Sequence, residues 1–118
     1  MGKSVSLCFL GQPIPCVRTT RKSLWTERSL RYAEYKKSLA LFIQAHRPGI
    51  FTGRLGLSAV FVRADNRRCD IDNLLKSLMD AFNLSGIVSD DSQIKKLKEV
   101  DVIVDKKNPR VEFTLYEL

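Results

Sequence analysis

Apolar and polar residues alternate in four separate stretches of the chain, and each stretch predicts a half-buried β-strand. The apolar positions, in chain order, are Val5, Leu7 and Phe9; Leu55, Leu57, Ala59 and Phe61; Val100, Val102 and Val104; and Val111, Phe113 and Leu115. Residues 105–109, Asp-Lys-Lys-Asn-Pro, separate the last two stretches. Their composition predicts a hairpin connection between neighbouring strands.

Two other stretches have the period of an α-helix. The first begins near Glu27 and ends at Pro48-Gly49; its apolar positions are Tyr32, Tyr35, Leu39, Phe42, Ile43 and His46. The second follows Asp72 and ends at Gly86, a residue typical of a helix C-terminus; its apolar positions are Leu74, Leu75, Leu78, Met79 and Phe82. The order β-α-β-α-β-β predicts a single α+β domain over residues 1–118, with both helices on one face of a mixed four-stranded sheet.

The length and cysteine content limit the possible chemistry. A chain of 118 residues can form one core without disulfides, and its three cysteines include no Cys-x-x-Cys pair. With a single histidine, His46, a zinc site would need mostly carboxylate ligands, which zinc seldom has. No apolar run approaches the roughly 20 residues of a membrane span. We therefore expect a cytoplasmic protein with free thiols and no membrane partner.

Positive charge is concentrated in the first half of the chain. The net charge is +7, and residues 1–64 hold eleven lysines and arginines against two acids. The remaining residues hold nine basic side chains against eleven acids. Such a distribution favours a polyanion such as nucleic acid as the partner, although a solvated basic surface is the alternative.

Two acidic pairs flank the second helix. Asp70 and Asp72 precede it, and in an extended stretch their side chains would point the same way, although a helix cap is the alternative. Asp90 and Asp91 follow it, where a turn is the alternative. If the chain turns back, three or four carboxylates gather in a small space. Such oxygen ligands suit Mg²⁺, for which Mn²⁺ can substitute.

A metal held by carboxylates can activate water against a phosphodiester without a histidine. Lys76, one turn after Asp72, can place a cation beside the phosphate; the alternative is an ion pair with Asp72. We expect backbone phosphates to be contacted by a further set of basic residues: Arg18, Arg21, Lys22, Arg28, Arg31, Arg67 and Arg68. Trp25 can stack on a base or pack in the core, while His46 and Cys69 are expected to have no catalytic role.

The block from Arg67 to Ile94, RRCDIDNLLKSLMDAFNLSGIVSDDSQI, resembles the RusA family of Holliday-junction resolvases. Its basic run, its D-x-D-N-L-x-K helix and the later Asp-Asp carry the resemblance. The resemblance implies a homodimeric endodeoxyribonuclease of DNA recombination and repair that binds four-way junctions. It also implies that Mg²⁺ or Mn²⁺ supports paired symmetric nicks.

Carried over residue by residue, the family's catalytic carboxylates match Asp70, Asp72 and Asp91, and its lysine matches Lys76. Asp90 is the adjacent candidate ligand. Cys69 departs from the family pattern, because a basic residue is common there. Two other interpretations remain: a basic DNA-binding module without catalysis, in which the aspartates cap a helix and close a turn, and an interaction protein whose charge is incidental.

Overall fold

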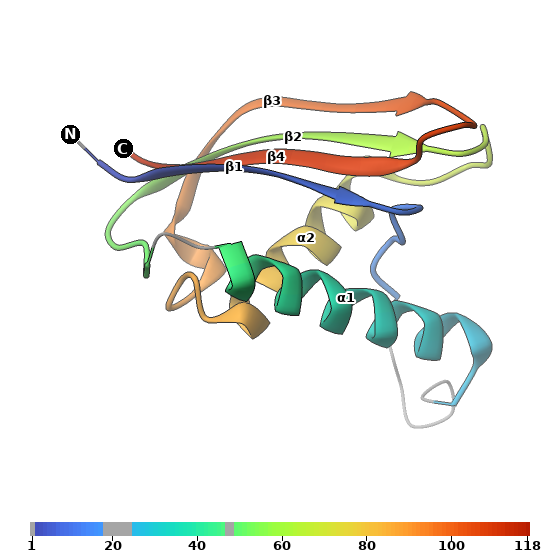
Figure 1. Ribbon diagram of the computed structural model, residues 1–118, viewed down its shortest axis with the longest axis horizontal. Coiled ribbons are helices and arrows are strands. Elements are labelled where there is room, and N and C mark those ends of the chain that lie inside the picture. The colour runs from blue at the N-terminus through green and yellow to red at the C-terminus, as the bar shows by residue number, and fades with distance from the viewer. Residues whose placement is uncertain (1, 18–24, 47–48) are drawn as a thin grey trace.

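A mixed sheet of four strands forms one layer of the molecule, and two α-helices form the other (Figure 1). The computed structural model describes residues 2–17, 25–46 and 49–118. In chain order the elements are β1 (Ser4–Leu10), α1 (Glu27–His46), β2 (Leu55–Arg63), α2 (Ile71–Ser85), the short 3-10 helix η1 (Asp91–Gln93), β3 (Ile94–Val104) and β4 (Arg110–Glu117). The predicted α+β class and element order are confirmed.

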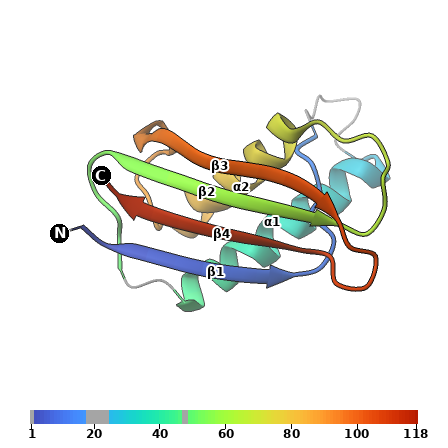
Figure 2. The same cartoon turned by 90° about the horizontal axis from the view of Figure 1, so that it is seen from above.

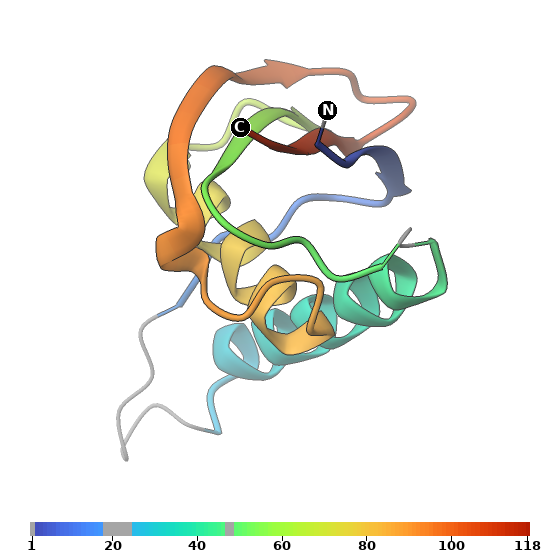
Figure 3. The ribbon, with the colours of Figure 1, turned by 90° about the vertical axis from the view of Figure 1, so that its left-hand side faces the viewer.

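The strands lie in the order β1-β4-β2-β3. β4 is antiparallel to both β1 and β2, whereas β2 and β3 are parallel. A parallel pair needs a crossover connection, and α2 with η1 supplies it. Both α-helices cover the same face of the sheet, and no helix of the described residues lies on the opposite face (Figure 2, Figure 3).

The predicted hairpin between the last two strands is wrong. β3 and β4 lie on opposite sides of β2, so residues 105–109 pass across the end of β2. The N–H of Asp105 donates to the carbonyl of Arg63 at 2.8 Å, and the carbonyl of Pro109 accepts from Gly11 at 3.0 Å. The turn composition was correctly recognised, but local sequence does not tell which strand lies beside which.

The core lies between the helices and the sheet. Leu74, Leu78 and Phe82 of α2 are buried, and the Phe82 ring packs edge-on against Phe113 of β4 with centroids 5.4 Å apart. Gly86 ends α2 in the left-handed conformation at φ 76°, as predicted. This packing fixes the apolar side of α2 against the sheet and leaves its acidic side at the molecular surface.

The edge strand β3 is less buried than its alternating pattern predicts. Val102 and Val104 are exposed, whereas the alternate residues of β4, such as Phe113, are buried. β4 lies between β1 and β2 in the part of the sheet that the helices cover, while β3 lies at the sheet's edge. Within the described ranges, no helix has the length and apolar character needed to cross a membrane.

Candidate functional site

Asp70 and Asp72 lie at the N-terminal end of α2. Asp70 is the extended residue before the helix, at φ −75° and ψ 132°, and Asp72 belongs to the first turn. The expectation that both lie in one extended stretch is therefore wrong, because the helix begins between them. The Asp70 side chain makes no capping hydrogen bond, so the proposed alternative of a side-chain cap is not observed either.

Both carboxylates at this helix end are exposed. Asp72 Oδ1 accepts a hydrogen bond from the N–H of Asn73 at 3.0 Å. In the described part of the chain, neither aspartate forms a salt bridge with a lysine or arginine. Negative charge is favoured at a helix N-terminus. Both carboxylates remain accessible to an external cation.

Asp90 and Asp91 belong to η1 and its cap, but their surroundings differ. The N–H of Asp90 donates to Gln93 Oε1 at 3.2 Å, and Ser92 Oγ donates to Asp90 Oδ2 at 2.5 Å. The Ser92 hydrogen bond lowers the pKa of Asp90 below its ordinary value. Asp90 thus closes the turn before β3, as its structural alternative predicts. Asp91 is the half-buried first residue of η1.

Lys76 connects the two acidic regions. Its Nζ lies 2.6 Å from Asp80 Oδ1, one turn further along α2, so the alternative of an ion pair with Asp72 is not observed. The hydrogen bond to Asp80 raises the pKa of Lys76, and the negative charge of Asp91 adds to this effect. η1 contacts α2, and Asp91 lies close enough to Lys76 for its charge to act on the lysine.

The expected gathering of three or four carboxylates is not observed: among the described residues, no three histidine, cysteine, aspartate or glutamate side chains are grouped closely enough to hold a metal by themselves. Mg²⁺ does not require such a cage, because one or two carboxylates commonly bind it together with water and substrate phosphate. Asp70 and Asp72 offer exposed carboxylates of this kind. The donor set therefore fits Mg²⁺ or Mn²⁺ better than a metal that prefers sulfur or imidazole.

Arginines surround the start of α2. A hollow of about 280 Å³ is lined by Asp70, Asn73, Arg68 and Arg28, together with Cys69. Arg28 also lines a second hollow of about 200 Å³. Its other charged lining residues are Arg31, Arg63, Asp65 and Arg67. Arg68 thus lines the same hollow as Asp70, whereas Arg67 lines the second hollow, and Arg18, Arg21 and Lys22 fall outside the described residues.

Arg63 is a site residue that the sequence did not identify. It is buried, and its Nη1 donates to the carbonyl of Pro13 at 2.9 Å while lying 3.6 Å from Cys69 Sγ. Its guanidinium ties the segment after β1 to the segment that leads into α2. The signal was an arginine at the last position of an otherwise apolar strand, where it resembles an ordinary polar strand end.

The surroundings of three further side chains distinguish between their alternative roles. Trp25 is 78% exposed, so the core interpretation of this side chain is wrong. The imidazole of His46 is hydrogen-bonded to the carbonyl of Phe42 at 2.8 Å, which agrees with a structural role. Burial raises the pKa of the Cys69 thiol, which disfavours the thiolate needed for a nucleophile.

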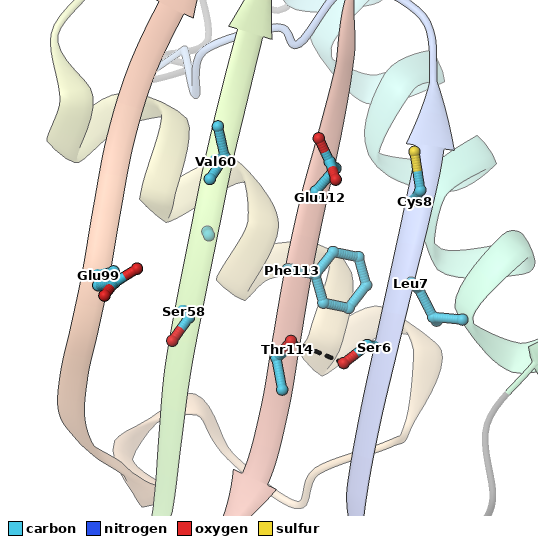
Figure 4. A pocket seen from close by; sticks show the side chains of 10 residues that line it. Ser6, Leu7, Cys8, Ser58, Val60, Glu99, Glu112, Phe113 and Thr114 are labelled. Carbon is cyan, nitrogen blue, oxygen red and sulfur yellow. Dashed lines mark hydrogen bonds between the residues drawn. The ribbon is translucent and has the colours of Figure 1, made fainter.

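A separate hollow of about 330 Å³ lies on the open face of the sheet (Figure 4). Ser6 and Thr114 are joined there by a 2.7 Å hydrogen bond. The charged residues that line it, Glu99 and Glu112, are both acidic. Because an anion would be repelled, this hollow does not suit a phosphate. The arginines and the exposed aspartates instead meet at the start of α2.

Comparison with known proteins identifies the family of the chain. The family model described as endodeoxyribonuclease RusA matches residues 10–116. The crossover junction endodeoxyribonuclease rusA of Enterobacteria phage HK97 is 30% identical over 83 residues, which cover 64% of this chain and 69% of that protein. The match includes the basic run, α2 and η1, where the aspartates and arginines meet. The chain therefore belongs to the RusA family of endodeoxyribonucleases.

Proposed function

We propose that this protein resolves four-way DNA junctions by metal-dependent hydrolysis of two phosphodiester bonds at symmetric positions. The observation that carries the proposal is the pair of exposed aspartates, Asp70 and Asp72, beside Arg68 at the start of α2. Cation ligands and phosphate-binding groups are thus adjacent. The family supports DNA as substrate, and its HK97 relative is by name a crossover junction enzyme.

Asp70, Asp72 and Asp91 are the proposed ligands of Mg²⁺, with Mn²⁺ as a substitute. Because these side chains are not grouped without a metal, the ion would have to draw them together, with water and substrate phosphate completing its coordination. Asp90 is the weakest candidate, because Ser92 and Gln93 already engage it. A bound divalent ion would supply Lewis-acid activation of water and neutralise charge on the phosphate. Lys76 carries a positive charge near Asp91, where it can stabilise the phosphate oxygens in the transition state.

The proposed DNA path runs over the two arginine-lined hollows. Arg28, Arg67 and Arg68 would contact phosphates on the side of Asp70 that leads toward α1. Arg18, Arg21 and Lys22 are proposed to continue this path on the basis of sequence alone. Trp25, exposed at the start of α1, is proposed to stack on an unpaired base near the branch point.

A homodimer follows from the symmetry of the substrate. Two cuts at matching positions of a two-fold junction require two copies of the site in two-fold relation. A monomer would cut the two strands independently, and nicked junctions would accumulate. The ratio of paired to single nicks, measured in a supercoiled plasmid that extrudes a cruciform, therefore reports the dimer directly.

The decisive test offers a labelled four-way junction and a matched linear duplex to the protein with Mg²⁺ and with EDTA. We expect symmetric nicks in the junction with Mg²⁺ alone. Asp70→Asn should bind the junction normally and lose nicking, since it removes a ligand charge without changing the basic surface. Salt-sensitive binding without Mg²⁺-dependent nicking would instead identify the alternative, a non-catalytic DNA-binding module.

A further inference from the structure

A second acidic centre on α2 lies outside the proposed metal site. Asp80 is largely buried, with 20% of its side chain exposed. Its Oδ1 accepts from Lys76 Nζ at 2.6 Å, and its Oδ2 accepts from the Tyr32 hydroxyl at 2.5 Å. Cys16 Sγ is a weaker donor at 3.8 Å from Oδ2. Donors from three different segments thus converge on one carboxylate.

These contacts hold the Asp80 carboxylate in one position and make it a poor metal ligand. It lies eight residues after Asp72 on the same helix, a rise of about 12 Å, which is too far to share one ion. Tyr32 is itself buried, and Lys36 Nζ lies 5.1 Å from the centroid of the Tyr32 ring. A carboxylate held by a buried hydroxyl has little freedom, so the ammonium bonded to it is also restrained.

Asp80 also contacts the segment that follows β1, through Cys16. Besides its thiol contact with Asp80, Cys16 donates its N–H to the carbonyl of Asn73 in the first turns of α2, at 2.9 Å. The segment that carries Cys16 also contributes Ile14 and Pro15 to the arginine-lined hollows. The proposed DNA surface and Lys76 are therefore anchored to one carboxylate.

We propose that Asp80 is a positioning residue that holds the Lys76 ammonium in place for phosphodiester hydrolysis. The inference rests on the proposed function of Lys76. Without Asp80, the lysine has several flexible bonds and no other acidic partner within salt-bridge distance among the described residues. The ammonium group would then sample many positions. A displacement of about 1 Å can lower the rate on the order of 100-fold.

The test is a double-substitution cycle on junction nicking. Asp80→Asn keeps the shape of the side chain, and we expect it to lower kcat by about 10- to 100-fold while leaving junction affinity in Ca²⁺ unchanged within about twofold. Lys76→Met alone should lower kcat by about 100-fold and leave a measurable rate. If Asp80 acts through Lys76, the double variant should be no slower than Lys76→Met, because residues that act as a unit are not additive.

Two further variants guard against a merely structural effect. Tyr32→Phe removes the hydroxyl that steadies Asp80, and it should give a smaller loss that also disappears in the Lys76→Met background. Glu112→Gln breaks another short ion pair, at 2.9 Å from Arg110 on the open face of the sheet, and should leave nicking unchanged. Thermal unfolding and Mg²⁺ titrations of each variant show whether the fold and metal requirement are retained.

The outcomes separate this inference from the proposed function. Normal nicking by both Asp80→Asn and Tyr32→Phe, with Lys76→Met impaired, would overturn the positioning role alone. Losses that multiply in the double variant would also overturn it, because Asp80 would then act independently of the lysine. Normal nicking by Lys76→Met would instead contradict the proposed role of Lys76 in catalysis.

Discussion

The two ends of the acidic surface of α2 carry the same residue type in opposite surroundings. Asp70 and Asp72, at the start of the helix, are exposed and have no cationic side-chain partner in the described residues. Asp80, two turns beyond Asp72, is largely buried and accepts from Lys76 and Tyr32. A carboxylate that is already paired and enclosed is a poor ligand, whereas an exposed one at a helix N-terminus can receive a cation.

The same contrast divides the second acidic pair. Asp90 is engaged by Ser92 and the cap of η1, while Asp91 acts electrostatically on Lys76. The environment, rather than the residue type, therefore separates candidate ligands from residues that maintain the fold. Substitutions at the two ends of this acidic surface should consequently impair different properties of the protein.

The largest expected difference concerns metal. Asp72→Asn should lower the nicking rate by about 1,000-fold at a fixed Mg²⁺ concentration, because losing a ligand charge forfeits several kcal/mol of transition-state stabilisation. Added Mg²⁺ should partly restore its activity. Asp80→Asn should keep the wild-type Mg²⁺ requirement. Mg²⁺ titrations of the nicking rate check both, and equal shifts in the two variants would remove the contrast.

The second prediction concerns the cation between the two ends. Lys76→Met should lower the nicking rate by about 100-fold, since one preorganised group that stabilises developing charge is lost. Lys76→Arg should recover part of this loss, because the charge is retained in a different shape. Single-turnover rates at saturating protein separate this effect from binding. A lysine that served only as a helix surface group would leave the rates unchanged.

For the free energy of unfolding, substitution of Asp80 should have a larger effect than substitution of Asp72, which is the reverse of the order expected for metal-dependent nicking. Asp80→Ala leaves the buried Tyr32 hydroxyl without its acceptor and should lower the free energy of unfolding by about 1–3 kcal/mol. Asp72→Ala loses only a favourable charge at a helix start, a cost below about 1 kcal/mol. Urea unfolding followed by circular dichroism measures both. A larger loss for Asp72→Ala would contradict the assigned surroundings.

The smallest effect is on acid stability. Burial raises the pKa of Asp80, but the hydrogen bonds from Lys76 and Tyr32 outweigh it, so the folded-state pKa lies below the ordinary 3.8. The stabilisation is present above 3.8 and is lost as pH falls through the folded-state value. Asp80→Asn should therefore flatten the decline of stability below about pH 4 relative to wild type. A decline as steep as that of wild type would argue against the Asp80–Lys76 pair.

Much of the fold was predictable because each element carries a local signal. The alternation of β2, the apolar stripe of α2 and the left-handed Gly86 all follow from short-range periodicity. Strand order was not predictable in this way. The insertion of β4 between β1 and β2 depends on pairings between residues about 50 or more positions apart, which no turn composition encodes.

The site shows the same division. The acidic and basic residues around Asp70 were identified from their types and spacing. The partner of Lys76 was not, because Asp72 and Asp80 are both four residues away on the same helix face and only tertiary packing against Tyr32 distinguishes them. Arg63 was missed for a similar reason, since its contact with Pro13 crosses 50 residues of sequence.

Mn²⁺ binding, followed by the EPR signal of the free ion, tests most directly whether the start of α2 and Asp91 share a divalent ion. Mn²⁺ would be titrated into four proteins: wild type, Asp70→Asn, Asp91→Asn and the exposed control Asp101→Asn. Each titration would contain a four-way junction and a high protein concentration in a buffer without added salt. We expect Asp70→Asn and Asp91→Asn to lose the same site, while Asp101→Asn binds as wild type does. Wild-type Mn²⁺ binding by Asp91→Asn would contradict a shared ion.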